Sequence, residues 1–106
     1  MSTSKKEEFK LTNWIIKEHP DFFKDLQKLG IRELRNFYKK KTKIKQDPLR
    51  VKHLSGGDNC YREPITDNLR LVYYVEANII WLLTVGTHKK VFKQYGKRLH
   101  SLKNKL

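Results

Sequence analysis

Three apolar runs between residues 60 and 85, joined by turns of two residues, constrain the fold of this chain more than any other feature. Turns this short make the runs neighbouring antiparallel strands. Pro64 lies inside the first run and has no backbone N–H to donate, so we expect that strand at a sheet edge or at a bulge. The strands are expected at Cys60–Thr66, Leu69–Glu76 and Ile79–Val85, with turns at Asp67-Asn68 and Ala77-Asn78.

The sequence before these runs predicts one strand and two helices. The strand is expected at Leu11–Lys17, and a first helix begins at His19-Pro20-Asp21, because proline and aspartate suit the first turn of a helix. Gly30 is expected to end that helix, so that a second helix follows in an antiparallel hairpin.

The second helix is expected from Ile31 to Gln46, since the residue before Pro48 is disfavoured in helical conformation. A loop is expected from Leu49 to Asn59. The apolar stripe of the helix recurs at helical spacing, in Ile31, Leu34, Phe37, Tyr38 and Ile44.

The C-terminal segment from Lys89 to Leu106 reads as a basic amphipathic helix, with its apolar stripe at Val91, Phe92, Tyr95, Leu99 and Leu102. Residues 1–8 are polar and are expected to form a flexible tail. We therefore predict a single α+β domain over residues 1–106: an antiparallel-dominated sheet with a helical hairpin on one face and a C-terminal basic helix.

Charge points to a polyanionic partner. Lys and Arg number 24 against 11 Asp and Glu, for a net charge of +13. This excess fits nucleic acid, an anionic membrane surface or an acidic protein, and a sequence pI near 10.0 is typical of nucleic-acid-binding domains.

Other features narrow the class of protein. The one cysteine, Cys60, excludes an intramolecular disulfide and a Cys-based zinc site. No apolar stretch approaches the roughly 18 residues of a membrane span, and the N-terminus lacks the apolar region of a signal peptide. No His, Asp or Glu spacing suggests a metal site, and no glycine-rich nucleotide loop occurs. We expect a reduced, cytoplasmic protein without a cofactor.

Arg70 and His88 are the strongest candidates for chemistry. Arg70 opens one strand, and His88 follows the Val85-Gly86-Thr87 end of the next. An arginine holds a phosphate through two parallel hydrogen bonds, and a histidine exchanges a proton near neutral pH. By alternation, Arg70 shares the less apolar face of its strand, which we expect to be open. In the alternative interpretation, Arg70 only forms a salt bridge to Asp67 or Glu63, and His88 has no catalytic role.

Two groups of basic residues are expected to flank this pair and to bind RNA. One comprises Lys39–Lys45, Arg50, Lys52 and His53, and the other Lys89, Lys90, Lys93, Lys97 and Arg98.

These residues together resemble the RelE/ParE superfamily of type II toxins, most closely its RelE, YoeB and YafQ ribonuclease branches. The resemblance covers about residues 12–92. It is carried by Asp47-Pro48-Leu49, Leu54-Ser55-Gly56, Tyr61-Arg62, Ile65 to Tyr73, and Gly86-Thr87-His88-Lys89.

The resemblance implies a microbial RNase-like fold, cleavage of messenger RNA in the ribosomal A site, and neutralisation by a cognate antitoxin in a hetero-oligomer. It implies that Arg70 contacts the scissile phosphate, that His88 transfers a proton, and that Asp47 stands where YoeB-type members place a catalytic glutamate. It adds Arg62 at a basic position of the family. The RNA-binding set is then Arg62, Lys52, His53, Lys89, Lys90 and Phe92.

The chain departs from the family pattern at two positions and in length. Phe92 stands where many members have a tyrosine, Pro64 replaces a basic residue, and the chain runs past the end of YoeB-like proteins. Two other functions stay open: a ParE-type toxin that inhibits DNA gyrase without nuclease activity, and a basic RNA-binding module without chemistry.

Overall fold

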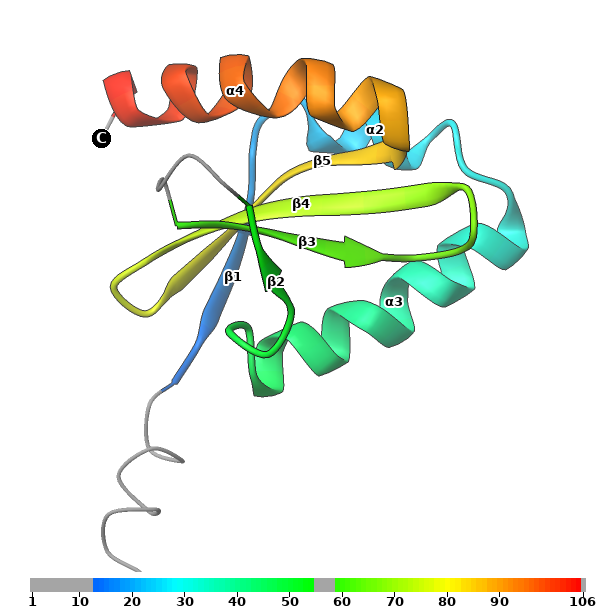
Figure 1. Ribbon diagram of the computed structural model, residues 1–106, viewed down its shortest axis with the longest axis horizontal. Helices are drawn as coiled ribbons and strands as arrows, with labels where there is room; N and C mark the ends of the chain where they lie inside the picture. The colour runs from blue at the N-terminus through cyan, green and yellow to red at the C-terminus, as the bar shows by residue number, and fades with distance from the viewer. Residues whose placement is uncertain (1–12, 55–58, 106) are drawn as a thin grey trace, which may run out of the picture.

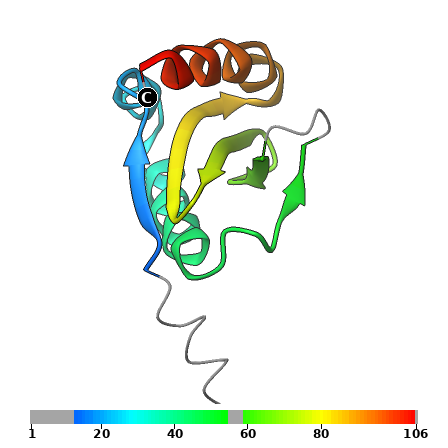
Figure 2. The same ribbon diagram turned by 90° about the vertical axis from the view of Figure 1, so that its left-hand side faces the viewer.

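The computed structural model describes residues 13–54 and 59–105, and in this part of the chain a mixed sheet of 5 strands has the order β1-β5-β4-β3-β2 (Figure 1). β1 pairs in parallel with β5, whereas all other neighbours are antiparallel, which confirms the antiparallel-dominated α+β fold. β1 and β2 lie at the two edges (Figure 2). The strands are β1 (Ile15–Glu18), β2 (Lys52–His53), β3 (Cys60–Pro64), β4 (Leu69–Glu76) and β5 (Ile79–Thr87).

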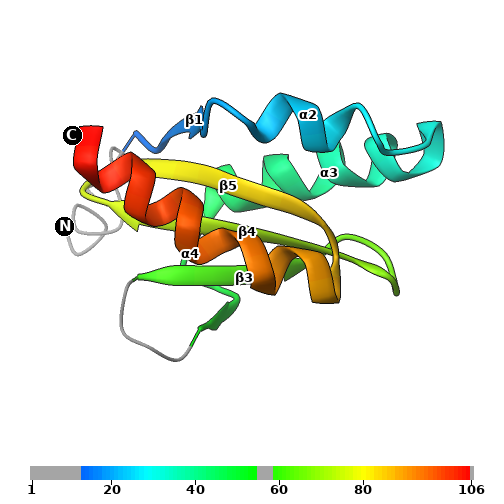
Figure 3. The ribbon, with the colours of Figure 1, turned by 90° about the horizontal axis from the view of Figure 1, so that it is seen from above.

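Helices cover both faces of this sheet. The predicted hairpin, α2 (Phe22–Leu26) followed by α3 (Ile31–Gln46), packs on one face, and α4 (His88–Lys105) lies across the other (Figure 3). The predicted bounds of α3 are confirmed at both ends. Among the described helices, none is both long and apolar enough to cross a bilayer.

The alternation along β4 places its side chains in two separate cores. Leu71 and Tyr73 pack toward the hairpin, while Val72 and Tyr74 pack under α4, and each of the four is at most 6% exposed. The expectation that the Arg70 face of β4 is open is therefore wrong for Val72 and Tyr74, which are buried under α4. The reason is that the apolar stripe of α4 must be buried, and Val91, Leu99 and Leu102 pack onto this face.

The connection between the hairpin helices differs from the prediction. Gly30 does not end α2, which stops at Leu26, but is the N-cap of α3, with an extended backbone (φ −77°, ψ 172°). Its N–H donates to Glu33 Oε1 at 2.8 Å, which satisfies one of the free amides at the helix start. Within the predicted apolar stripe, Phe37 and Ile44 are buried, whereas Ile31 is 75% exposed.

The predicted loop from Leu49 to Asn59 contains the short strand β2, which pairs with Tyr61 and Arg62 of β3. Residues 55–58 of this segment lie outside the described chain, as do residues 1–12 and with them the predicted tail at residues 1–8. The strand predicted at Leu11–Lys17 is found as β1 at Ile15–Glu18, and the described residues Asn13 and Trp14 are not part of it. Pro64 ends β3 beyond the reach of β2, as expected of a proline at a sheet edge. The bulge falls instead in the β4–β5 pair, between Val72 and Tyr73.

The segment after α3 is fixed to the hairpin face by two buried polar groups. Glu63 is 2% exposed and accepts from Arg50 Nη2 at 2.6 Å, with Lys40 Nζ at 3.5 Å. The Tyr73 hydroxyl donates to the Pro48 carbonyl, and burial, followed by the charge of Glu63, raises the pKa of Tyr73. These bonds hold the turn that leads from α3 into β2.

Candidate functional site

The register of the β4–β5 pair brings the two main candidates to one end of the sheet. Arg70 pairs with Gly86, and α4 begins two residues later at His88. Arg70 shares its face with Val72, which lies under α4, so Arg70 and the first turn of α4 stand on the same side of the sheet. His88 is exposed and is the first residue of α4, one residue before the predicted start of the C-terminal helix at Lys89. Arg70 and His88 share no hydrogen bond or ring contact in the described chain.

Arg70 is held in place by the β3–β4 turn. Its Nη1 donates to the carbonyl oxygens of Thr66, Asp67 and Leu69, at 2.8, 3.2 and 3.0 Å. The alternative salt bridge to Asp67 or Glu63 does not form in the described chain, because Glu63 lies on the other face with Arg50. These three bonds all come from Nη1, so the other N–H groups of the guanidinium can donate to a phosphate.

Phe92 joins two further candidates into one cluster. The centroids of the Phe92 and His88 rings lie 4.5 Å apart, edge to face, and the Arg62 guanidinium carbon lies 5.8 Å from the Phe92 centroid. The Tyr95 ring also contacts Phe92 edge to face, with the two centroids 6.2 Å apart. An aromatic ring that contacts a cation and an imidazole restricts where both can point. Arg62, Phe92 and His88 thus form a cation–aromatic cluster at the N-terminal end of α4.

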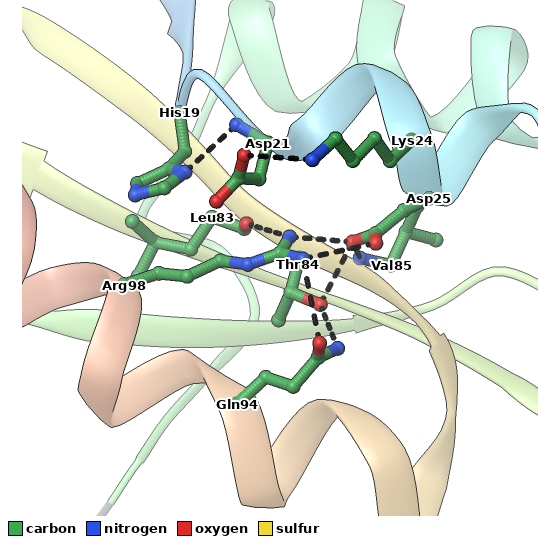
Figure 4. Close-up of polar contacts among 9 residues, drawn as sticks. All are labelled: His19, Asp21, Lys24, Asp25, Leu83, Thr84, Val85, Gln94 and Arg98. Carbon is green, nitrogen blue, oxygen red and sulfur yellow. Dashed lines mark hydrogen bonds and ion pairs between the residues drawn. The ribbon is translucent and has the colours of Figure 1, made fainter.

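A buried ion pair fixes α4 against α2 and β5 (Figure 4). Arg98 donates to both carboxylate oxygens of Asp25, at 2.7 and 3.1 Å, and to the Leu83 carbonyl at 2.8 Å. Thr84 Oγ1 and the Val85 N–H also donate to Asp25. We refer to the Asp25–Arg98 pair with Thr84 as the α4 latch.

The α4 latch corrects the predicted RNA-binding role of Arg98, whose side chain is 12% exposed and committed to Asp25. Sequence reasoning did not identify Asp25. A signal was present, because Asp25 lies between Phe22 and Leu26 on the apolar face of α2, and Arg98 interrupts the stripe next to Leu99. An acid on one apolar face and a base on another indicate a buried pair.

The structure separates Asp47 and His53 from this cluster. Asp47 is the C-cap residue of α3, and its Oδ1 accepts the Leu49 N–H at 3.3 Å. This hydrogen bond stabilises the turn that follows the helix. His53 pairs with Tyr61, and its ring contacts the Tyr61 ring at 4.9 Å on the hairpin face. The backbone of Lys52 pairs with Arg62, so β2 runs beside the cluster. The catalytic role of Asp47 and the RNA-binding role of His53 stay predictions.

The remaining cations are distributed unevenly. Lys89 is exposed and Lys90 half-buried in the first turn of α4. In the other predicted group, Lys40 pairs with Glu63 and Lys41 lies 3.9 Å from Glu18, so part of the positive charge of α3 is already compensated.

The chemistry available at this end of the sheet is that of guanidinium, ammonium and imidazole groups. In residues 13–54 and 59–105, no three or more His, Cys, Asp or Glu side chains gather into a metal-binding group. The cations can hold phosphate oxygens, and an imidazole is a group that transfers protons in acid–base catalysis.

Comparison with known proteins identifies the fold. No protein-family model and no curated protein sequence matches the chain. Among solved structures, an arginine-to-alanine double mutant of E. coli toxin RelE in the free state has a TM-score of 0.70 at 23% identity, covering 81% of this chain and 97% of RelE. The E. coli DinJ–YafQ toxin–antitoxin complex has a TM-score of 0.65 at 16% identity, covering 76% and 98%.

An archaeal RelE–RelB complex from Pyrococcus horikoshii OT3 has a TM-score of 0.61 at 24% identity, covering 71% of this chain and 94% of the matched chain. The protein therefore has a RelE-like toxin fold, as the resemblance in its motifs implied.

Proposed function

We propose that this protein is the toxin of a type II toxin–antitoxin pair and that it cleaves messenger RNA on the ribosome. The observation that carries the proposal is the placement of Arg70 on the same side and at the same end of the sheet as the Arg62–Phe92–His88 cluster. The RelE-like fold, which structures of RelE and YafQ toxins share, supports the same function. The net charge of +13 supports an RNA partner.

The proposed reaction uses the RNA's own 2′-hydroxyl as the nucleophile. The 2′-oxygen bonds to the adjacent phosphorus and the bond from phosphorus to the 5′-oxygen breaks, leaving a 2′,3′-cyclic phosphate and a 5′-hydroxyl. One proton leaves the 2′-hydroxyl and one reaches the 5′-oxygen, and His88 transfers one of the two. Negative charge grows on the phosphate oxygens in the transition state, where the N–H groups of Arg70 stabilise it.

Arg62 and Phe92 take supporting roles in this proposal. Arg62 lies over the Phe92 ring, which also contacts the His88 ring, and in this proposal it holds a phosphate next to the reacting one. Phe92 has no hydroxyl and therefore transfers no proton in this proposal. It orients Arg62 and His88, and the face of its ring can stack on a nucleobase of the RNA.

The proposed partners are the ribosome with its messenger RNA and a cognate antitoxin. Solved relatives of the fold include complexes described as RelBE and DinJ–YafQ toxin–antitoxin complexes. An acidic antitoxin would complement the positive charge of this chain.

The test is induction of the protein in growing cells, followed by mapping of RNA ends. We expect growth arrest and new messenger RNA ends within translated codons for the wild type, and neither for His88→Gln or Arg70→Ala. Growth arrest with intact messenger RNA and inhibited gyrase would instead establish the gyrase-directed alternative.

A further inference from the structure

The outer edge of β1 is open in the described chain. The N–H groups of Ile15 and His19 donate to carbonyl oxygens in residues 78–82, each at 2.9 Å, so the odd-numbered residues of this segment bond toward β5. Because backbone groups alternate in direction along a strand, the N–H and C=O groups of Ile16 and Glu18 point away from β5. No other described strand pairs with β1 (Figure 2). An added strand can therefore bond to this edge.

A hollow of about 670 Å³ lies beside the open edge, between β1 and α3. Its walls combine apolar and basic side chains from the two elements: Trp14, Ile15, Ile16, Tyr38, Lys41 and Lys45. Ile15 is 45% exposed and Tyr38 is 52% exposed, so large apolar side chains face solvent here. We refer to the hollow together with the open edge of β1 as the β1 groove.

The β1 groove carries positive charge. Lys41 lies 3.9 Å from Glu18, a long distance for an ion pair. Lys45 is exposed, and none of the carboxylates in residues 13–54 and 59–105 forms an ion pair with it. The two lysines lie about 6 Å apart along the axis of α3, and alternate side chains of a strand lie about 6.7 Å apart. Acidic side chains on one face of an added strand therefore match this spacing.

We infer that the β1 groove binds an extended, acidic segment of a partner protein, which adds a strand to the sheet. The backbone of this segment bonds to Ile16 and Glu18, and one row of its side chains is acidic and faces Lys41 and Lys45. The opposite row is apolar, because it lies beside the exposed side chain of Ile15. Strand addition at an exposed sheet edge is a common mode of peptide recognition.

The charge and the backbone edge together select an acidic protein segment over other occupants. A second copy of this chain would bring another net charge of +13 to a basic groove. RNA phosphates can meet the lysines, but RNA has no row of amides at strand spacing to pair with Ile16 and Glu18. An acidic strand satisfies both the lysines and the free backbone groups.

The β1 groove lies apart from the Arg62–Phe92–His88 cluster. Two strands, β5 and β4, separate β1 from β3, which carries Arg62. The groove is lined by α3, which packs on the hairpin face, whereas the cluster includes α4 on the other face. A partner in the groove leaves the cluster accessible, so the inference goes beyond the proposed function and does not depend on it.

The first experiment measures, by fluorescence anisotropy, how a labelled peptide of alternating valine and glutamate binds to the full chain. It compares the wild type, the double variant Lys41→Gln/Lys45→Gln, and the control Lys39→Gln/Lys43→Gln, which removes the same charge at the same spacing from another side of α3. We expect the first double variant to bind about tenfold more weakly than the control. We expect no binding of a peptide with lysine in place of glutamate.

Two outcomes of this experiment contradict the inference. Equal losses of affinity in the two double variants would mean that the peptide responds only to net charge. Displacement of the peptide by a single-stranded RNA with methylated 2′-hydroxyls, which is not cleaved, would reassign the β1 groove to RNA.

The second experiment follows amide hydrogen exchange by NMR along β1. In the free chain, the amides of Ile16 and Glu18 should exchange quickly, and the amide of Lys17, which faces β5, more slowly. Saturating peptide should slow exchange at Ile16 and Glu18 about tenfold or more and change Lys17 little. Unchanged exchange at both residues overturns strand addition, and slow exchange already in the free chain means that the chain itself or a second copy covers the edge. Neither experiment depends on RNA cleavage, so a failure of the proposed nuclease activity is seen separately.

Discussion

The α4 latch allows a quantitative test of what holds this fold together. Asp25 is 3% exposed and accepts from Thr84 Oγ1, the Val85 N–H and both terminal nitrogens of Arg98. Asp25→Asn keeps the shape but replaces one acceptor oxygen by an NH₂ group that faces donors. It also leaves the Arg98 guanidinium, 12% exposed, without its counter-charge.

Removing one partner of a buried ion pair costs about 3 kcal/mol or more. In a domain of this size, a loss of about 3 kcal/mol lowers the melting temperature by on the order of 10–20 °C. Total stabilities of small domains are about 5–15 kcal/mol, so the variant should still fold at room temperature.

The matched control for this prediction is Asp21→Asn, the same substitution four residues earlier. Asp21 pairs with Lys24 at 3.7 Å, but both side chains are at least half exposed, so its loss should cost less than about 1 kcal/mol. Urea unfolding followed by tryptophan fluorescence, with signals from Trp14 and Trp81, measures both variants. If the two variants unfold at the same urea concentration, the latch does not stabilise the fold and the reasoning is refuted.

Four further outcomes are expected. Arg70→Lys should cut RNA cleavage about 10²- to 10³-fold while the melting temperature changes little, because a lysine keeps the charge but loses the planar fork; wild-type cleavage would remove Arg70 from the chemistry. His88→Gln should slow single-turnover cleavage on programmed ribosomes about 10²- to 10⁴-fold without weakening ribosome binding, and an unchanged rate would assign the proton transfer elsewhere. Tyr73→Phe should cost about 1–2 kcal/mol at pH 7 by leaving the Pro48 carbonyl unpaired. Because burial raises the pKa of Tyr73, the protonated hydroxyl stabilises the fold fully below the unfolded-state pKa of about 10, and this contribution is lost as the pH rises further. The urea midpoint of Tyr73→Phe should therefore fall less at alkaline pH than that of the wild type. Equal decreases in the two midpoints would contradict this. Hydrogen exchange over residues 93–102 should change when an antitoxin binds, if the antitoxin competes with α4 for the sheet face that α4 covers; identical exchange would favour direct masking of Arg70 and His88.

Local pattern alone determined most of the elements. The bounds of α3, the positions of the three antiparallel strands and the helical character of residues 89–105 follow from apolar periodicity and from turn residues such as Asp67 and Asn68. These features depend on contacts a few residues apart, and the backbone geometry of helices and strands fixes their repeat. The strand register then placed Arg70 opposite Gly86, two residues before His88, as the short turns implied.

Only the tertiary structure decided which faces of the sheet are covered and which charged side chains meet. Asp25 and Arg98 are 73 residues apart in sequence, and no local repeat links them. The placement of α4 over the Val72 face closed a surface that alternation had left open, because the apolar stripe of α4 has to be buried. The same packing left Asp47, at the end of α3, on the opposite side of the sheet from Arg62 and Phe92. Which charges meet depends on how the layers stack, and stacking minimises exposed apolar area over the whole chain rather than within any one segment.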